Sequence, residues 1–256
     1  MNLVCVSTTG AINGVECFHS SLSGCLTPDG RGLRSFGLDN QTPPLMASDG
    51  SSDMFFSTDN TRLYVPVKGN AVDNNGFISV FPVENGLVAA EDIRSTPDGI
   101  ELLFGGFQVP GSENKIFVSD AAFGAVVLEF DSKSHATLIG KTVSNPPVPA
   151  LCWAEYSPVS KSAWVTSPFS NTLLAMDVET SALIAQTNIT NANNGILDFV
   201  VPGRYLYGLA TGTSPDTDAA IIVVDISLGA AHPEVVQFYP IGNGVNNIAH
   251  GLAYWD

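Results

Sequence analysis

The segment AVVLEFD at residues 125–131 decides the fold, because similar segments recur along the chain. Each copy is a short run of aliphatic residues that ends in a bulky side chain, which is typical of a buried β-strand. The copies are FISVF at 77–81, AVVLEF at 125–130, TLLAM at 172–176 and AIIVV at 220–224. Asp131, Asp177 and Asp225 directly follow three of these copies, as expected where a turn begins.

Further β segments accompany each copy at regular positions. One precedes it, at 62–67, 115–118, 162–166 and 204–207; another lies further upstream, at 53–56, 101–104, 152–156 and 196–200. A less regular segment follows, at 87–90, 136–139, 182–185 and 235–238. Four strands in a repeat of roughly 40–50 residues indicate the blade of a β-propeller, whose first strand is the innermost.

The two ends of the chain complement each other. Residues 2–6 fit the second strand of a blade, so the first blade lacks its innermost strand, while HGLAYW at 250–255 is a strand without a partner. We therefore predict one all-β domain, residues 1–256, a β-propeller of five four-stranded blades. The C-terminal strand would close it as the innermost strand of the N-terminal blade, leaving no bare sheet edge. An incomplete larger propeller is the alternative.

Composition excludes several classes of function. The 256 residues carry 10 Lys and Arg against 25 Asp and Glu, a net charge of −15. Nucleic-acid binding is excluded because it requires clustered basic residues, and an anionic membrane surface would repel such a chain. No motif indicates a nucleotide, haem or flavin, and no signal peptide is visible in the first residues. We expect a monomer whose partner is a small molecule or a glycan.

Ionisable residues recur on the predicted innermost strands, which line the central channel of a propeller. They are Asp53, Glu101, Glu155, Asp198 and, on the closing strand, His250. Glu155 and Asp198 are expected to be equivalent, since each lies eight residues before a matching position in the next strand. Such a cluster has three interpretations: solvated groups lining a water-filled channel, a site for a hard cation such as Ca²⁺, or acid–base chemistry. For catalysis the candidates are Glu155, Asp198, Asp53 and His250.

Two tryptophans lie on the same predicted strands. Trp153 and Trp255, together with Glu101, are the candidates for contact with a ligand. Burial of the indole rings in the core is the alternative interpretation. No required cofactor is predicted, although a divalent cation such as calcium would suit the carboxylates.

Four cysteines are present, and two of them fall on consecutive predicted strands. Cys5 and Cys17 lie opposite each other in a hairpin centred on Ala11, so a cross-strand disulfide is geometrically plausible. Two reduced thiols in the core are the alternative. Asn40 and Asn188 begin glycosylation sequons. With the Gly-, Asn- and Ser-rich loops, these features favour an extracellular or cell-surface protein.

Several motifs resemble a family of fungal secreted propellers described as lactonase-like or carboxy-cis,cis-muconate cyclase-like. The matching stretches are 4–6, 10–18, 37–44 and 152–158. The resemblance implies seven-bladed relatives with a signal peptide, compared with which this chain begins inside the third blade. It also favours the disulfide over free thiols.

Two functions follow as hypotheses. The first is an enzyme that opens, closes or isomerises a lactone or small organic acid bound in the central channel. The second is a non-catalytic secreted or cell-surface binding glycoprotein, whose loops contact a partner.

Overall fold

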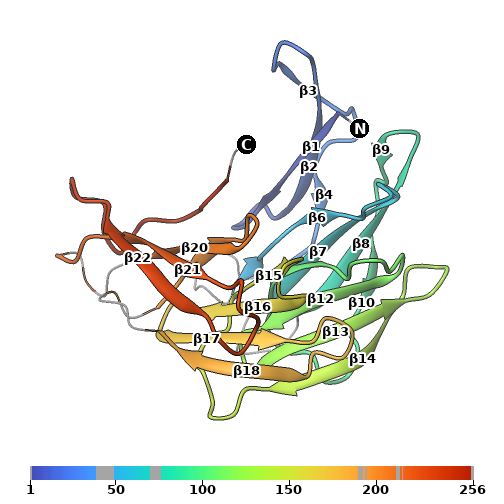
Figure 1. Ribbon diagram of the computed structural model, residues 1–256. Coiled ribbons are helices and arrows are strands. Elements are labelled where there is room, and N and C mark those ends of the chain that lie inside the picture. The colour runs from blue at the N-terminus through green and yellow to red at the C-terminus, as the bar shows by residue number, and fades with distance from the viewer. Residues whose placement is uncertain are drawn as a thin grey trace. The chain divides into compact units, whose positions relative to one another are not determined.

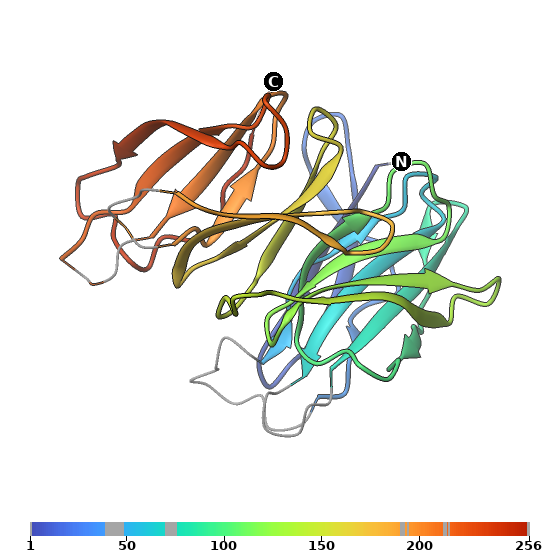
Figure 2. The same cartoon turned by 60° about the horizontal axis from the view of Figure 1, so that its bottom comes forward.

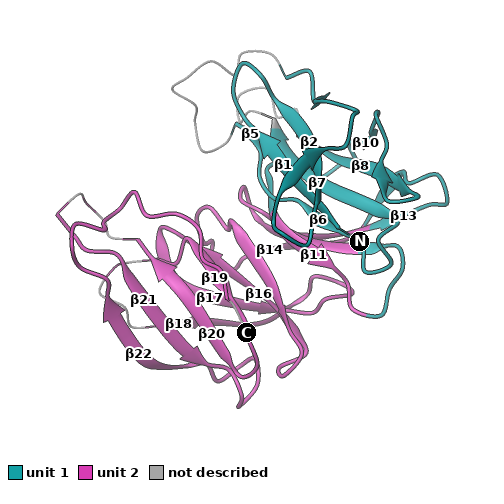
Figure 3. Cartoon of the chain, turned by 90° about the horizontal axis from the view of Figure 1, so that it is seen from above, with its two compact units in different colours: residues 1–104, 111–115, 129–138 teal, residues 105–110, 116–128, 139–256 magenta. Residues whose placement is uncertain are grey.

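The computed structural model describes residues 2–38, 49–69, 76–189, 193, 195–211, 214 and 216–254. This part of the chain contains β-strands and no helix, and hence no helix that could cross a membrane. The chain divides into two compact units (Figure 3). Unit 1 comprises residues 1–104, 111–115 and 129–138, and unit 2 comprises 105–110, 116–128 and 139–256.

The strands form five antiparallel sheets in chain order (Figure 1). The first two sheets lie in unit 1. The first contains β1 (Leu3–Thr8), β2 (Gly14–Ser20), β3 (Leu26–Pro28) and β4 (Arg34–Ser35). The second contains β5 (Gly50–Ser51), β6 (Phe55–Phe56), β7 (Arg62–Gly69), β8 (Phe77–Glu84), β9 (Leu87–Val88) and β10 (Ile93–Ser95).

The remaining sheets are regular four-stranded meanders. The third contains β11 (Leu103–Gln108), β12 (Lys115–Asp120), β13 (Gly124–Phe130) and β14 (Ala136–Val143). The fourth contains β15 (Trp153–Ser157), β16 (Ser162–Ser167), β17 (Ser170–Met176) and β18 (Leu183–Asn188). The fifth contains β19 (Asp198–Val200), β20 (Tyr205–Ala210), β21 (Ala220–Asp225) and β22 (Glu234–Pro240). The strands of the fourth and fifth sheets, yellow to red, are clear in Figure 2.

Burial explains why the repeat is visible in the sequence. The apolar copies are the strands β8, β13, β17 and β21, which are buried along most of their length because their side chains pack into the hydrophobic clusters. The last strands of the third and fourth sheets are less buried, and β14 alternates half-buried with exposed residues. The predicted all-β organisation in serial antiparallel sheets is confirmed; four of the five sheets have four strands, and the second has six.

Each unit has its own core. In unit 1, Cys17, Phe36, Leu63 and Phe81 belong to one buried cluster. In unit 2, one cluster joins the third and fourth sheets through side chains such as Phe117 and Met176. Another joins the fourth and fifth sheets, and it includes Trp164, Phe199 and Val224. The aspartates predicted to begin turns do so: the carboxylates of Asp131, Asp177 and Asp225 accept backbone N–H groups two residues further on.

The predicted disulfide is present. Cys5 on β1 and Cys17 on β2 are directly paired, with their Cα atoms 4.0 Å apart. Cys25 and Cys152 are not part of a disulfide; the first is exposed and the second is buried.

The described residues do not form the predicted closing strand. Residues 250–254 form no strand, and β1 pairs only with β2 in the described part of the chain. Gly251 has a φ of 81°, a left-handed conformation that interrupts an extended strand at the second residue of the predicted segment. The backbone of this segment instead contacts Asp198 of its own unit.

Candidate functional site

The most distinctive ionisable group of unit 2 is Asp198, the first residue of β19. Its side chain is buried, with only 8% of the residue exposed. The carboxylate atom Oδ2 accepts the backbone N–H of Leu252 at 2.7 Å. The buried carboxyl group is therefore held against the C-terminal segment, 54 residues further along the chain.

Burial raises the pKa of Asp198 above its ordinary value, because desolvation disfavours the charged carboxylate. Three smaller effects act in the opposite direction: the backbone N–H groups of Leu252 and Phe199, and the positive charge that His250 carries when protonated. Asp198 thus keeps its proton to a higher pH than an ordinary aspartate does.

His250 lies two residues before Leu252, whose backbone N–H donates to Asp198. Its imidazole is exposed, and it is close enough for its charge to act on Asp198. The turn at Gly251 separates His250 from Leu252, so that one short segment brings both an imidazole and a backbone donor to β19. Of the predicted site residues, Asp198 and His250 are therefore within electrostatic range of each other.

Glu155 is not equivalent to Asp198, contrary to the prediction. When the fourth and fifth sheets are aligned on their third strands, β17 and β21, Thr166 of β16 matches Leu209 of β20. Trp153 pairs with Thr166 and Asp198 pairs with Leu209, so Asp198 corresponds to Trp153. Glu155 lies two residues further along, roughly 7 Å. Counting eight residues fails because the hairpin between β19 and β20 is two residues shorter than the one between β15 and β16.

The two carboxylates also lie on different sides of β19. Phe199 packs into the core between the fourth and fifth sheets, so its neighbour Asp198 points to the opposite face. Trp153 packs against that same core, and Glu155 shares its face because the two are two residues apart in β15. The backbone of β19 therefore separates Glu155 from Asp198. Trp153 is half-buried because its side chain packs against this core.

The other predicted residues have separate positions. Asp53 and Glu101 belong to unit 1: Asp53 lies between β5 and β6, and Glu101 is exposed two residues before β11. Both therefore lie outside the observed strands, although the sequence predicted them within strands 53–56 and 101–104. Asn188 is exposed at the end of β18. Asn40 and Trp255 lie outside the described residues.

No metal centre is evident in the described part of the chain. There, no three His, Cys, Asp or Glu side chains come together in a way that could hold a metal ion. The Leu252 N–H is the contact that sequence analysis missed. Only Gly251, within a predicted strand, hinted that the segment turns there.

Comparison with known proteins places the chain in a fold class. No protein-family model matches it, and no curated protein sequence does. Among solved structures, a candidate 6-phosphogluconolactonase of Bacteroides uniformis matches with a TM-score of 0.66 at 16% identity, over 94% of this chain and 69% of that one. The periplasmic gluconolactonase of Pseudomonas aeruginosa matches with a TM-score of 0.66 at 14% identity and the same coverage. These likenesses show the β-propeller fold that the repeats predict.

Proposed function

We propose that the chain is a lactonase-like propeller that binds and hydrolyses a small lactone, with Asp198 and His250 as its acid–base pair. One observation carries the proposal: a buried carboxyl group with a raised pKa lies within electrostatic range of an exposed imidazole. The names of the structurally similar proteins support the same class of substrate, and so does the family resemblance of the sequence.

The two groups suit different steps of ring opening. His250 would remove a proton from water, whose oxygen then bonds to the lactone carbonyl carbon. As the ring C–O bond breaks, the ring oxygen would take the proton that the raised pKa lets Asp198 retain. The protonated imidazole would then return its proton to Asp198, so the pair ends the cycle as it began.

The other predicted groups are not required by this proposal. Glu155 and Trp153 lie on the other side of β19 from Asp198, and together with Asp53 and Glu101 they remain predictions from the sequence. A cyclase or isomerase acting on a small organic acid would use the same pair in a different order. A divalent cation such as calcium remains a prediction, which a comparison of activity with and without a chelator tests.

The test is a pH–rate profile on a panel of uncharged lactones. We expect the D198N and H250Q variants to lose about 10²- to 10⁴-fold in kcat/KM. In the wild type, activity should fall with rising pH as Asp198 loses its proton, and D198N should lack this alkaline limb. D216N, which changes an exposed carboxylate of unit 2, is the control. Full activity in a folded D198N variant would overturn the assignment, and no turnover by the wild type would overturn the enzyme.

A non-catalytic binding glycoprotein is the second candidate, favoured by the exposure of Asn188 in its sequon. The Cys5–Cys17 disulfide supports an oxidising, extracellular location for either function. This candidate predicts a glycan on Asn188 in the secreted protein and retention on fungal cell-wall material without turnover.

A further inference from the structure

A small cavity in unit 1 has one positive and one negative side chain on its wall. Its volume is about 240 Å³, and it is lined by Arg31, Pro82, Glu84, Leu87 and Ala89. In the described part of the chain, the side chains of Arg31 and Glu84 form no hydrogen bond or ion pair with each other or with any other group.

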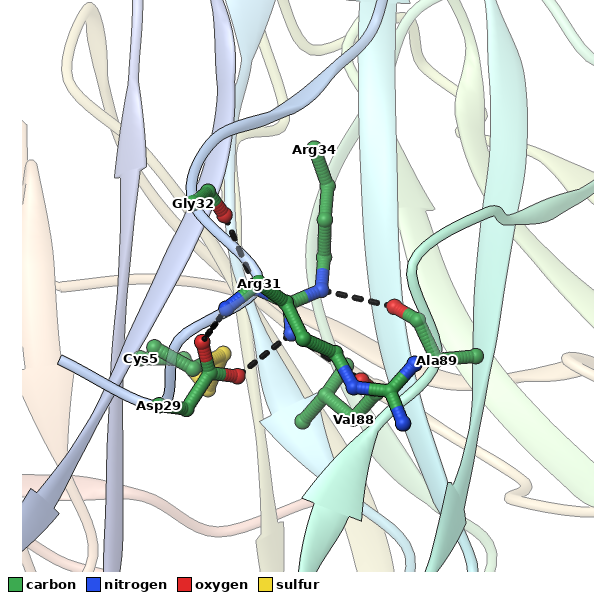
Figure 4. Close-up of polar contacts among 8 residues, drawn as sticks. Cys5, Asp29, Arg31, Gly32, Arg34, Val88 and Ala89 are labelled. Atoms are coloured by element: carbon green, nitrogen blue, oxygen red, sulfur yellow. Dashed lines mark hydrogen bonds and ion pairs between the residues drawn. A yellow bond between two sulfur atoms is a disulfide. The ribbon is translucent and has the colours of Figure 1, made fainter.

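The wall that carries Arg31 is rigid. The Arg34 guanidinium donates to the Asp29 carboxylate and to the carbonyl oxygens of Val88 and Ala89 (Figure 4). Asp29 also accepts the backbone N–H of Arg31 at 3.0 Å. This network fixes the backbone of Arg31, and Figure 4 shows the Arg31 side chain extending toward Ala89, with which it lines the cavity.

The wall that carries Glu84 is a tight hairpin. Glu84 at the end of β8 pairs with Leu87 at the start of β9. The two residues between them, Asn85 and Gly86, have φ values of 52° and 76°, as in the type I′ turn that favours Asn-Gly. Such a two-residue turn holds Glu84 and Leu87 in a fixed relation.

We propose that this cavity binds a free α-amino acid as its zwitterion. The Arg31 guanidinium would bind the α-carboxylate, and the Glu84 carboxylate would bind the α-ammonium group. Pro82, Leu87 and Ala89 provide an apolar surface for the amino-acid side chain. Opposite charges that do not pair with each other match a ligand of zero net charge that carries both signs. A larger cavity of about 360 Å³ is also lined by an arginine, Arg62, but this guanidinium already donates to the Glu113 carbonyl oxygen.

The test is an NMR titration of the isotope-labelled protein with three compounds. These are L-leucine, N-acetyl-L-leucine, which lacks the ammonium group, and L-leucinamide, which lacks the carboxylate. We expect L-leucine to shift the amide signals of residues 31, 84, 87 and 89 with a Kd on the order of 1 mM. Each analogue should bind about 10-fold more weakly, because it loses one charge-assisted contact.

Two variants assign the contacts. R31Q should abolish the preference for leucine over leucinamide, and E84Q should abolish the preference over N-acetyl-leucine. K133Q and E91Q change exposed charges of unit 1 outside the cavity and should preserve both preferences. The proposal is wrong if leucine causes no saturable shift up to about 100 mM. It is also wrong if the three compounds bind equally, or if neither cavity variant changes their order.

Discussion

Arg34 shows how one side chain holds neighbouring elements together. Its side chain is 1% exposed, as is that of Asp29, and its guanidinium also bonds to carbonyl oxygens more than fifty residues away in the chain. Arg94 makes the reciprocal contact, from the second sheet to the carbonyl oxygens of Ser35 and Phe36. Two arginines therefore join the first sheet to the second through hydrogen bonds to backbone carbonyl oxygens.

Replacing Arg34 is expected to be severe. R34M should lower the free energy of unfolding by about 3–5 kcal/mol, because it leaves the Asp29 carboxylate buried without its cationic partner. The double variant D29N/R34M should recover part of this loss, since no unpaired charge then remains. Urea unfolding measures both, with R31Q as a control that removes an exposed arginine. An R34M protein as stable as R31Q would contradict this account.

At the scale of the element, the disulfide stabilises a strand at the edge of its sheet. Within the described residues β1 pairs only with β2, and Val4 and Val6 are exposed on it. Because the bond closes a loop between residues 12 positions apart, C5S/C17S should lower the free energy of unfolding by about 2–3 kcal/mol. Amide hydrogen exchange should accelerate in β1 more than in β8. C25S, which removes an exposed free thiol, should change neither the free energy of unfolding nor the exchange rates. If the amides of β1 exchange equally fast in the wild type and in C5S/C17S, the disulfide does not stabilise β1.

Elements were predictable where local chemistry decides them. Alternation and apolar runs located β8, β13, β17 and β21, and the aspartates after β13, β17 and β21 located the turns. The innermost strands were less predictable: β6 is only two residues long, and Asp53 and Glu101 fall outside their strands. Their length depends on contacts with other strands, which a local pattern does not record.

The candidate site was predictable in part for the same reason. Asp198 was identified from its place in the repeat, but its burial and its bond to Leu252 depend on the path of the C-terminal segment. The mistaken pairing of Glu155 with Asp198 came from a hairpin whose length differs between blades. The Asp29–Arg34 pair was missed because its burial depends on Val88 and Ala89, which are distant in sequence.

At the scale of the whole molecule, acid should destabilise the fold through its turns. The pKa values of Asp59, Asp131, Asp177 and Asp225 are all lowered, mainly by hydrogen bonds within turns. A carboxyl group whose pKa is lower in the folded state stabilises the fold above its unfolded pKa, and this contribution disappears as pH falls through the folded value. The ordinary pKa of an aspartate in the unfolded chain is 3.8. The urea concentration at the midpoint of unfolding should therefore decrease as the pH is lowered from 5 to 2. The raised pKa of Asp198 opposes this trend, but it is one group against four.

The triple variant D131N/D177N/D225N tests the origin of this pH dependence. It should be less stable than the wild type at pH 7, because a neutral amide accepts the turn N–H groups more weakly than a carboxylate does. It should also lose less stability on acidification, so that the two curves of urea midpoint against pH converge near pH 2. Added salt separates this effect from the repulsion within a chain of net charge −15: screening should raise the midpoint of both proteins at pH 7 without making the curves converge. Parallel curves from pH 7 to pH 2 would show that these turns do not cause the acid sensitivity.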